Sequence, residues 1–280
     1  MVRTAPVLVL GSVVSVQLGQ ALGKGLFSAL SPSGVVALRL GIAAAALVAL
    51  HRPRLPCTPR GALPALGFGT AIAGMNLIYP ALARLPLGTA VSVQLLGPIA
   101  LALLCSRRLA DAAFAALAAC GVWLFHGPGG APPFDGLLFA LASGTAMAAY
   151  LLLSRNAGRA EAPAATLTLA VCWAALLWLP AGIAVDGATL YRPAVLLTGA
   201  TVAVLSAVIP YSLDLAALRR LPPRTVGILE SLEPAVAGIA GVVVLAEVLS
   251  APQWAAIGCV CAAGAGAVAT EQGARNRSVT

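Results

Sequence analysis

The sequence has very little charge for a chain of 280 residues. Asp, Glu, Lys and Arg make up 9% of it, whereas hydrophobic residues make up 60%. Soluble globular domains carry about 25% charged and about 45–50% apolar residues. This chain therefore lacks the polar residues needed to cover a water-facing surface. The composition excludes a soluble enzyme, a disordered regulator and a disulfide-stapled secreted domain, and it indicates an integral membrane protein.

The sequence also lacks the common motifs of catalysis. It contains no Walker loop, no Gly-x-Ser-x-Gly nucleophile elbow, no His-Glu-x-x-His zinc motif and no acid-rich metal cluster. Its six cysteines form no metal-binding pattern. Cys259 and Cys261, two apart, would point about 200° away from each other on a helix. We therefore expect no cofactor, no metal and no enzymatic activity.

Long apolar runs fill most of the chain. A transmembrane helix needs about 20 mainly apolar residues. Helix-breaking and charged residues divide this sequence into ten such runs. The sequence thus predicts an all-α membrane protein with ten transmembrane helices and short connections. The predicted spans cover residues 5–23, 33–51, 61–83, 86–105, 109–126, 135–154, 163–183, 194–218, 225–246 and 252–270.

The basic residues orient these spans. With ten spans both termini lie on one side, and the loops of that side hold thirteen arginines, from Arg3 to Arg277. The opposite loops hold only Lys24, Arg84 and Arg192. Because positively charged loops stay in the cytoplasm, we expect both termini to be cytoplasmic. The net charge of +8 comes from the arginines of these loops, which set the orientation in the membrane. We therefore expect no nucleic-acid partner.

The two halves of the sequence repeat each other at an offset of 136 residues. The segment 81–86 matches 217–222, and Thr89, Gln94, Leu96 and Pro98 fall on Thr225, Glu230, Leu232 and Pro234. Each half holds five spans, so the second copy would enter the membrane upside down. Inverted repeats are typical of secondary transporters, with the substrate site where the halves meet. We predict a first repeat over residues 1–130 and a second over residues 131–280. The alternative is chance similarity between small apolar helices.

Ten short stretches that combine glycine, proline or polar residues with apolar ones are distributed along the chain. They are Leu22-Gly23-Lys24-Gly25-Leu26-Phe27, Ala37-Leu38-Arg39-Leu40, Gly74-Met75-Asn76, Leu85-Pro86-Leu87-Gly88, Gly97-Pro98, Ser106-Arg107-Arg108, Ile209-Pro210-Tyr211-Ser212-Leu213-Asp214, Leu221-Pro222, Arg224-Thr225 and Glu233-Pro234. With the five-plus-five spans, these stretches resemble the EamA branch of the drug/metabolite transporter superfamily. Within that branch the chain is similar to the inner-membrane threonine/homoserine exporters. The resemblance implies export of amino acids or related metabolites.

Four ionisable residues lie inside predicted spans, where each costs about 2.5–3.5 kcal/mol on insertion scales and needs a partner or a purpose. They are Arg39, Asp214, Glu230 and Glu233. Arg39 fits the carboxylate of a substrate, but it could equally pair with an acid or reach the interface. Asp214 lies near Arg219 and Arg220 and could form a structural ion pair with them instead of serving transport.

The ninth span combines two acids with a proline. Glu230 and Glu233 are three apart, which places them on one face of a helix, and neighbouring carboxylates in low dielectric do not ionise together easily. Pro234 removes a backbone donor and tends to open the preceding turn. Pro98 occupies the equivalent place in the first half. We therefore expect Pro98 and Pro234 to act as hinges, and Glu230, with Asp214, to couple protons. Either glutamate could instead serve as a structural lock on Arg39.

These residues predict a binding site for a zwitterion. Arg39 would hold its carboxylate and Glu233 or Glu230 its ammonium group, while Asn76, Gln94 and Tyr211 supply neutral polar contacts. Tyr211 could also be a packing residue. We predict a proton-coupled exporter of threonine-like amino acids in the bacterial inner membrane, with the lipid bilayer and a small-molecule substrate as partners. A homodimer is compatible with this interpretation. The alternative is a permease for a drug, a nucleotide-linked compound or a sugar, with an enzyme or a structural partner protein a distant third.

Overall fold

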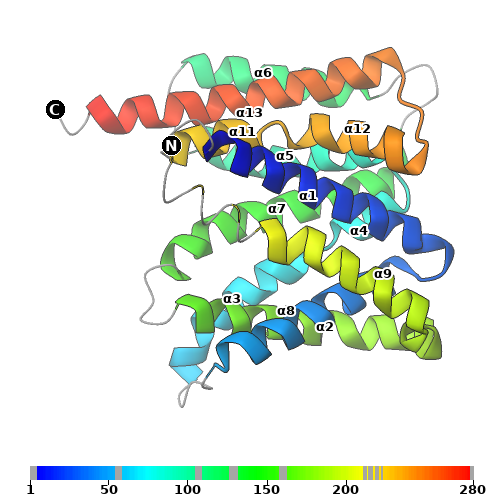
Figure 1. Cartoon of the computed structure of the whole chain (residues 1–280). Helices are drawn as coiled ribbons and strands as arrows, with labels where there is room; N and C mark the ends of the chain where they lie inside the picture. The colour runs from blue at the N-terminus through cyan, green and yellow to red at the C-terminus, as the bar shows by residue number, and fades with distance from the viewer. Residues whose placement is uncertain are drawn as a thin grey trace.

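The computed structural model describes residues 5–53, 59–104, 109–125, 132–157, 163–210, 213, 217, 221 and 223–277. Within these ranges the chain is helical and contains no β-strand. The helices form an elongated bundle in which α1 begins and α13 ends at the same end (Figure 1). Two of the residues predicted to form the site, Tyr211 and Asp214, lie outside the described residues.

The first half of the chain contains α1 (Ala5–Gly25), the 3-10 turn η2 (Leu26–Ser28), α2 (Pro32–His51), α3 (Pro59–Met75), α4 (Ile78–Leu82), α5 (Leu87–Leu104) and α6 (Leu109–Leu124). The second half contains α7 (Phe134–Ala157), α8 (Pro163–Asp186), the 3-10 turn η3 (Gly187–Tyr191), α9 (Pro193–Ala203), the π-helical turn η4 (Val204–Val208), α11 (Pro223–Glu230), α12 (Glu233–Leu245) and α13 (Ala251–Arg277).

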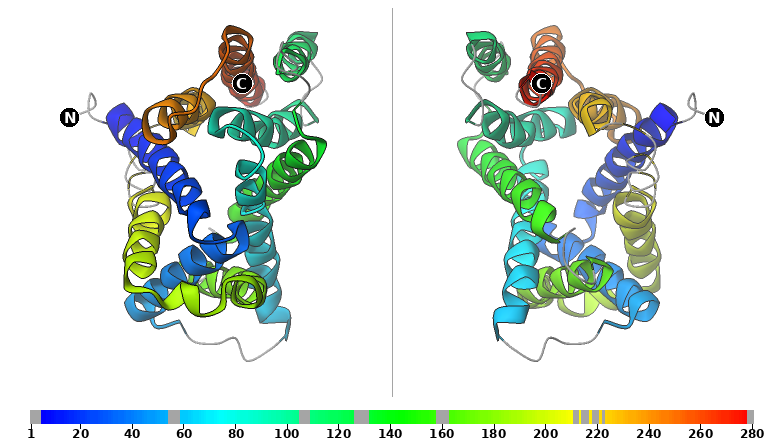
Figure 2. Two further views of the ribbon diagram at one scale, coloured as in Figure 1. Left: turned by 90° about the vertical axis from the view of Figure 1, so that its right-hand side faces the viewer. Right: turned by 90° about the vertical axis from the view of Figure 1, so that its left-hand side faces the viewer.

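Two helix pairs form opposite edges of the bundle. The α6 helix packs against α13 at one edge, and α2 packs against α8 at the other (Figures 1 and 2). Between them, α5 contacts α7 and α12, while α1 lies against α12 and η4. Both edge pairs join a helix of the first half to one of the second, so neither half is an independent globule.

Among the described residues, seven helical segments are long and apolar enough to cross a membrane: 6–28, 32–51, 62–82, 134–153, 164–191, 225–245 and 251–268. Three shorter apolar segments, 87–102, 113–124 and 193–208, coincide with the other three predicted spans. The expectation of an all-α membrane protein is confirmed. The ten-span count and the orientation remain predictions.

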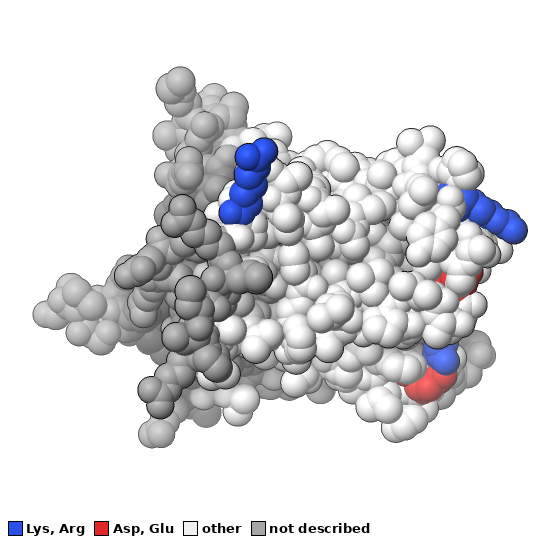
Figure 3. All heavy atoms as spheres, turned by 90° about the horizontal axis from the view of Figure 1, so that it is seen from below, with Lys and Arg blue, Asp and Glu red and all other residues white. Residues whose placement is uncertain are grey.

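Apolar side chains form the core and also lie on the outer surface, where Leu197 and Val243 are 72% and 76% exposed. Serine, threonine, glutamine and asparagine side chains are buried, including Gln17, Asn76 and Gln94. In the face shown in Figure 3 the central part carries no described charged residue, and Asp and Glu gather at one end. This pattern fits a protein surrounded by lipid.

Three predicted spans are not continuous α-helices. The third divides into α3 and α4 around Asn76, the eighth passes from α9 into the π-helical turn η4, and the ninth divides into α11 and α12. In contrast, α5 continues through Pro98. Interrupted helices at membrane depth expose backbone polar groups, which is tolerated only inside the protein or along a cavity.

One end of the bundle is held by charged contacts. Lys24 forms an ion pair with Glu247, and the exposed Arg84 pairs with Asp135. Asp186, at the end of α8, accepts hydrogen bonds from the backbone N–H and the hydroxyl of Ser31, the N-cap of α2. By the predicted topology this end faces outward, away from the cytoplasm. The three contacts join elements of the first half of the chain to elements of the second half.

Candidate functional site

Arg39 is held in the interior of the bundle by neutral groups. Its Nε donates to the Ser206 hydroxyl at 2.6 Å, Nη1 donates to Asn76 Oδ1 at 2.5 Å, and Nη2 donates to the Ser206 carbonyl at 3.0 Å. Among the described residues no carboxylate lies within ion-pair distance of it. The alternative in which a glutamate locks Arg39 therefore finds no support in the described part of the chain.

The breaks in the third and eighth spans supply these partners. Asn76 follows the last residue of α3, and its Nδ2 donates back to the Ile72 carbonyl at 2.8 Å, which fixes its Oδ1 toward Arg39. Ser206 lies in η4, where the wider π-helical turn presents both its hydroxyl and its carbonyl to the guanidinium. Single π-helical turns occur frequently at functional sites.

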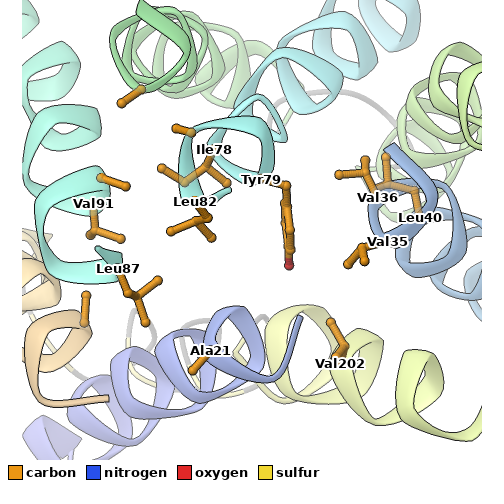
Figure 4. Packing of buried hydrophobic residues seen from close by; sticks show 14 of the residues in the cluster. Ala21, Val35, Val36, Leu40, Ile78, Tyr79, Leu82, Leu87, Val91 and Val202 are labelled. Carbon is orange, nitrogen blue, oxygen red and sulfur yellow. The ribbon is translucent and has the colours of Figure 1, made fainter. Parts of the chain in front are cut away.

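Tyr79 forms another wall of this cluster. Arg39 lies over its ring, 5.9 Å from the ring centroid to the guanidinium carbon. The ring is 1% exposed, packed between Val36 and Leu40 of α2 and Leu82 of its own helix (Figure 4). Its hydroxyl points toward the junction of α1 and α9 (Figure 4). A cation over an aromatic face is attracted by the ring, so Tyr79 stabilises the charge of Arg39 without neutralising it.

The glycines of α1 allow that helix to close over the cluster. A Cβ at Gly19 would lie 2.8 Å from the Ser206 Cβ, and one at Gly23 would lie 2.8 Å from the Tyr79 ring. Helices approach this closely where small residues meet a neighbour. The α1 helix therefore lies directly against two of the groups that hold Arg39.

Gln94 belongs to a second network that meets the first at the α3–α4 break. Its Nε2 donates to the Ser143 hydroxyl of α7 at 2.7 Å, and that hydroxyl donates to the Met75 carbonyl at 2.6 Å. Met75 directly precedes Asn76. The structure thus brings Arg39 and Asn76 into direct contact, and it places Gln94 two hydrogen bonds away.

Pro98 acts here through a carbonyl and not through a break. A proline removes the helical hydrogen bond to the carbonyl four residues earlier, which is that of Gln94. The backbone of α7 approaches this carbonyl so closely at Gly144 that a Cβ there would overlap it. A helix opened by Pro98 is therefore not observed. The expected role of Pro98 as a hinge remains a prediction.

The ninth span is interrupted between its two acids. α11 ends at Glu230, residues Ser231 and Leu232 form a turn, and α12 begins at Glu233, with Pro234 in its first turn. The shared face expected from one continuous helix therefore does not follow. Both glutamates are half-buried, and neither is without a partner.

Several buried polar atoms have no hydrogen-bond partner in the described structure. They are both amide atoms of Gln17, Oε1 of Gln20, the Tyr79 hydroxyl and the Thr89 hydroxyl. The Tyr79 hydroxyl faces Ser206, but the Ser206 hydroxyl donates to the Val202 carbonyl at 2.6 Å and forms no well-shaped bond with it. Leaving such a group unsatisfied costs about 1–3 kcal/mol, so each is a place where water or a ligand would bind.

The cluster around Arg39 can bind an anion in one defined way. The guanidinium has five N–H donors, and the three hydrogen bonds use both sides of its Nε–Nη2 fork and one hydrogen of Nη1. One N–H on each terminal nitrogen remains. Two such parallel donors match the two oxygens of a carboxylate.

Sequence reasoning identified Arg39, Asn76 and Gln94 but missed Tyr79, Ser206 and Ser143. Tyr79 stands three residues after Asn76, which on a helix suggests a common face, so spacing could have found it. Ser206 could have been found from Pro210, which leaves the Ser206 carbonyl without its helical donor. Ser143 carries no such signal, because serine is frequent at ordinary helix contacts in membranes. The ion pair between Lys24 and Glu247 was also not predicted from the sequence, because 223 residues separate them.

Comparisons with known proteins place the chain among membrane transporters. Residues 135–268 match the EamA-like transporter family. The chain is 38% identical over 269 residues to the threonine/homoserine exporter RhtA of Escherichia coli (strain K12), covering 94% of this chain and 91% of that protein. It is also 38% identical over 271 residues to the threonine/homoserine exporter RhtA of Salmonella typhimurium (strain LT2), covering 95% and 92%. A crystal structure with 21% identity superimposes with a TM-score of 0.64 over 98% of both chains, which shows the fold.

Proposed function

The chain belongs to the EamA-like transporter family, and from this premise we propose that it exports small neutral amino acids of the threonine and homoserine type. Membership of the family confirms a multi-pass membrane transporter and not an enzyme, as the sequence indicates. The bacterial origin of its relatives agrees with the expected location in a bacterial inner membrane.

The observation that carries this proposal is the state of Arg39. A guanidinium at membrane depth is costly unless it is paired. Arg39 is half-buried, and its guanidinium is held by an amide, a serine and an aromatic ring. Its charge is thus positioned but not neutralised by any described carboxylate. An arriving substrate carboxylate would supply the missing negative charge.

The ammonium group of the substrate needs an acceptor in the same interior. Glu233 is our proposed partner, because it begins α12 at the interruption of the ninth span. Free backbone carbonyls at such an interruption can add to the binding of a cation. The α1 helix packs on α12 and on η4, so one helix borders both the Arg39 cluster and the element that carries Glu233. In this proposal Tyr211 completes the polar lining.

We propose proton coupling through Glu230, with Asp214 as a second titrating group. Glu230 is half-buried at the end of α11, one turn before Glu233. An ionisable carboxyl inside a span is typical of proton relays, so a proton could be taken up on one side and released on the other. In this scheme Pro98 and Pro234 let the fourth and ninth spans bend during the cycle.

The pairing of helices supports the proposed repeats over residues 1–130 and 131–280. If α1–α6 and α7–α13 are two copies of one unit, each contact should have a counterpart with the halves exchanged. The α5·α7 contact then corresponds to α12·α1, the α3·α7 contact to η4·α1, and the α3·α8 contact to α9·α2. All six contacts occur in the bundle, although the large α5·α13 contact lacks an equally extensive counterpart between α6 and α12. This agreement favours two copies whose interface contains Arg39 and its partners.

A flux assay in sealed vesicles tests the proposed function. The purified protein is reconstituted into liposomes, and efflux of labelled threonine, homoserine, alanine, glutamate and lysine is measured with and without a pH gradient. We expect threonine and homoserine to leave faster than from vesicles carrying the Arg39→Gln variant, and the two charged amino acids to stay. Equal efflux from both kinds of vesicle would contradict the proposal.

A further inference from the structure

The Tyr79 hydroxyl and the Gln20 amide oxygen are two unpaired polar atoms on one side of the Arg39 cluster. Tyr79 is 1% exposed, so no bulk water reaches its hydroxyl. The ring is fixed between α2 and α4 (Figure 4), and it cannot swing its hydroxyl to another partner without displacing that packing. Buried polar groups in folded proteins almost always have a partner. The Ser206 hydroxyl, which the Tyr79 hydroxyl faces, already bonds Arg39 and the Val202 carbonyl and makes no well-formed hydrogen bond with Tyr79.

The position of Gly23 places Gln20 beside that hydroxyl. A Cβ at Gly23 would lie 3.3 Å from the Tyr79 hydroxyl oxygen, so this atom touches the backbone of α1. Gln20 stands three residues earlier on α1, and residues three apart are neighbours on a helix surface. Gln20 therefore begins within one helical turn of the glycine that meets the Tyr79 ring.

The two atoms are complementary to a third group and not to each other. The Gln20 Oε1 accepts hydrogen bonds only, whereas the tyrosine hydroxyl can donate one and accept others. They do not pair directly in the structure. A hydroxyl placed between them would accept from Tyr79 and donate to Gln20, so it would satisfy both atoms at once. A methyl group in the same place would satisfy neither.

We propose that Tyr79 and Gln20 form the subsite that recognises the hydroxyl group of the substrate, beside the guanidinium that binds its carboxylate. This inference rests on the proposed function and adds its selectivity. Arg39 alone would accept any small amino acid. Tyr79 and Gln20 then select those that carry a hydroxyl on the side chain, because an apolar analogue leaves two buried polar groups unpaired.

Threonine and valine provide the test, because they have nearly the same shape and differ by a hydroxyl in place of a methyl group. Efflux of each is measured in reconstituted vesicles for the wild type, Tyr79→Phe and Gln20→Leu. A site built to bind a hydroxyl rejects the analogue that lacks it by a large factor. We expect the wild type to prefer threonine at least about tenfold and each variant to lose most of this preference, chiefly by slower threonine efflux.

Thr89→Val is the matched control. Thr89 also carries a buried hydroxyl without a partner, but it lies at the start of α5, two residues after Leu87, which binds Glu247. Both Tyr79→Phe and Thr89→Val remove an unpaired buried hydroxyl and keep the shape of the side chain. We expect Thr89→Val to leave the ratio of threonine to valine efflux unchanged.

The outcomes separate the two proposals. If the wild type exports amino acids but Tyr79→Phe and Gln20→Leu keep the wild-type preference, the hydroxyl subsite is wrong while the proposed function stands. A structural water between the two atoms would give this result. If a variant that unfolds at the wild-type temperature loses threonine and valine efflux equally, its residue has a structural role and the inference fails. If the wild type exports no amino acid, the proposed function fails and the subsite with it.

Discussion

The Lys24 ammonium group lies 2.6 Å from Glu247 Oε1 and also donates to the Leu85 carbonyl at 2.7 Å. The second oxygen of Glu247 accepts from the backbone N–H of Leu87 at 2.9 Å. One ion pair therefore joins the end of α1, the α4–α5 connection and the end of α12. The two side chains are only 19% and 13% exposed, so this contact is shielded from solvent in a way that the exposed Arg84–Asp135 pair is not.

We expect Lys24→Met to destabilise the protein in detergent by about 1–3 kcal/mol, because a charged hydrogen-bond partner of a largely buried carboxylate is lost. Adding Glu247→Gln should restore part of this loss, since the remaining carboxylate is then no longer unpaired. Thermal unfolding followed by tryptophan fluorescence measures both variants. Arg84→Met serves as the control and should cost less than about 1 kcal/mol. Additive losses for Lys24→Met and Glu247→Gln would show that the pair is not coupled.

Asn76→Asp should weaken substrate binding while the protein remains folded. The aspartate keeps an acceptor toward Arg39 but turns the neutral contact into an ion pair, which competes with the substrate carboxylate. It also gives up the hydrogen bond to the Ile72 carbonyl, a loss of about 1 kcal/mol. We expect threonine affinity, measured by isothermal titration calorimetry in detergent, to fall at least about tenfold, or 1.4 kcal/mol.

Gln253→Glu is the corresponding amide-to-acid change outside the cluster. Its Oε1 caps the first turn of α13 by accepting from the Ser250 backbone N–H at 2.8 Å, and a carboxylate can do the same. This variant should bind threonine as the wild type does. If Asn76→Asp binds threonine with unchanged affinity, the proposal that Arg39 binds the substrate carboxylate is wrong.

Glu230→Gln should uncouple transport from the pH gradient. The amide keeps the shape of the side chain and cannot titrate, so a proton can no longer be carried. We expect proton-driven accumulation of threonine in vesicles to be lost while threonine exchange without a gradient persists. Full accumulation in this variant would exclude Glu230 as the coupling group and leave Asp214 and Glu233 to be tested.

The predicted topology places residues 155–161 in the cytoplasm and residues 127–134 outside, as the distribution of arginines requires. In a cysteine-free background, Ala131→Cys should react with a membrane-impermeant maleimide in intact cells, and Asn156→Cys should react only after the membrane is opened. The opposite labelling pattern would invert the orientation and place Lys24 and Glu247 at the cytoplasmic end.

Composition and periodic apolar runs were sufficient to predict the class of fold. All seven long apolar segments and the three shorter ones fall on predicted spans, because the bilayer imposes a fixed length on each helix. The same reasoning identified Arg39 and Asn76, since a charge or an amide in such a run is expensive. Their contact across 37 residues depends on how two helices are rotated, which no local pattern encodes.

The interruptions of the helices were predicted less well than the helices themselves. Pro234 coincides with a break, whereas Pro98 lies in a continuous helix, so a proline alone does not decide whether a span divides. At Pro98 the neighbouring helix approaches at Gly144 and covers the carbonyl that the proline leaves without its helical partner. The outcome is thus decided by the packing partner, which lies in the other half of the sequence. The π-helical turn at Ser206 does have a proline signal, because Pro210 cannot donate to the Ser206 carbonyl four residues earlier.

That π-helical turn makes chain length a determinant of the Arg39 cluster. A turn with hydrogen bonds five residues apart contains one residue more than the α-helical turn it replaces. Deleting one residue between Val204 and Val208 would replace the wider turn by a regular α-helical one. Ser206 would then lose its simultaneous hold on Arg39 through hydroxyl and carbonyl. Loss of a single codon in this span should therefore damage transport more than most substitutions within it, even though the span would remain long and apolar enough to insert.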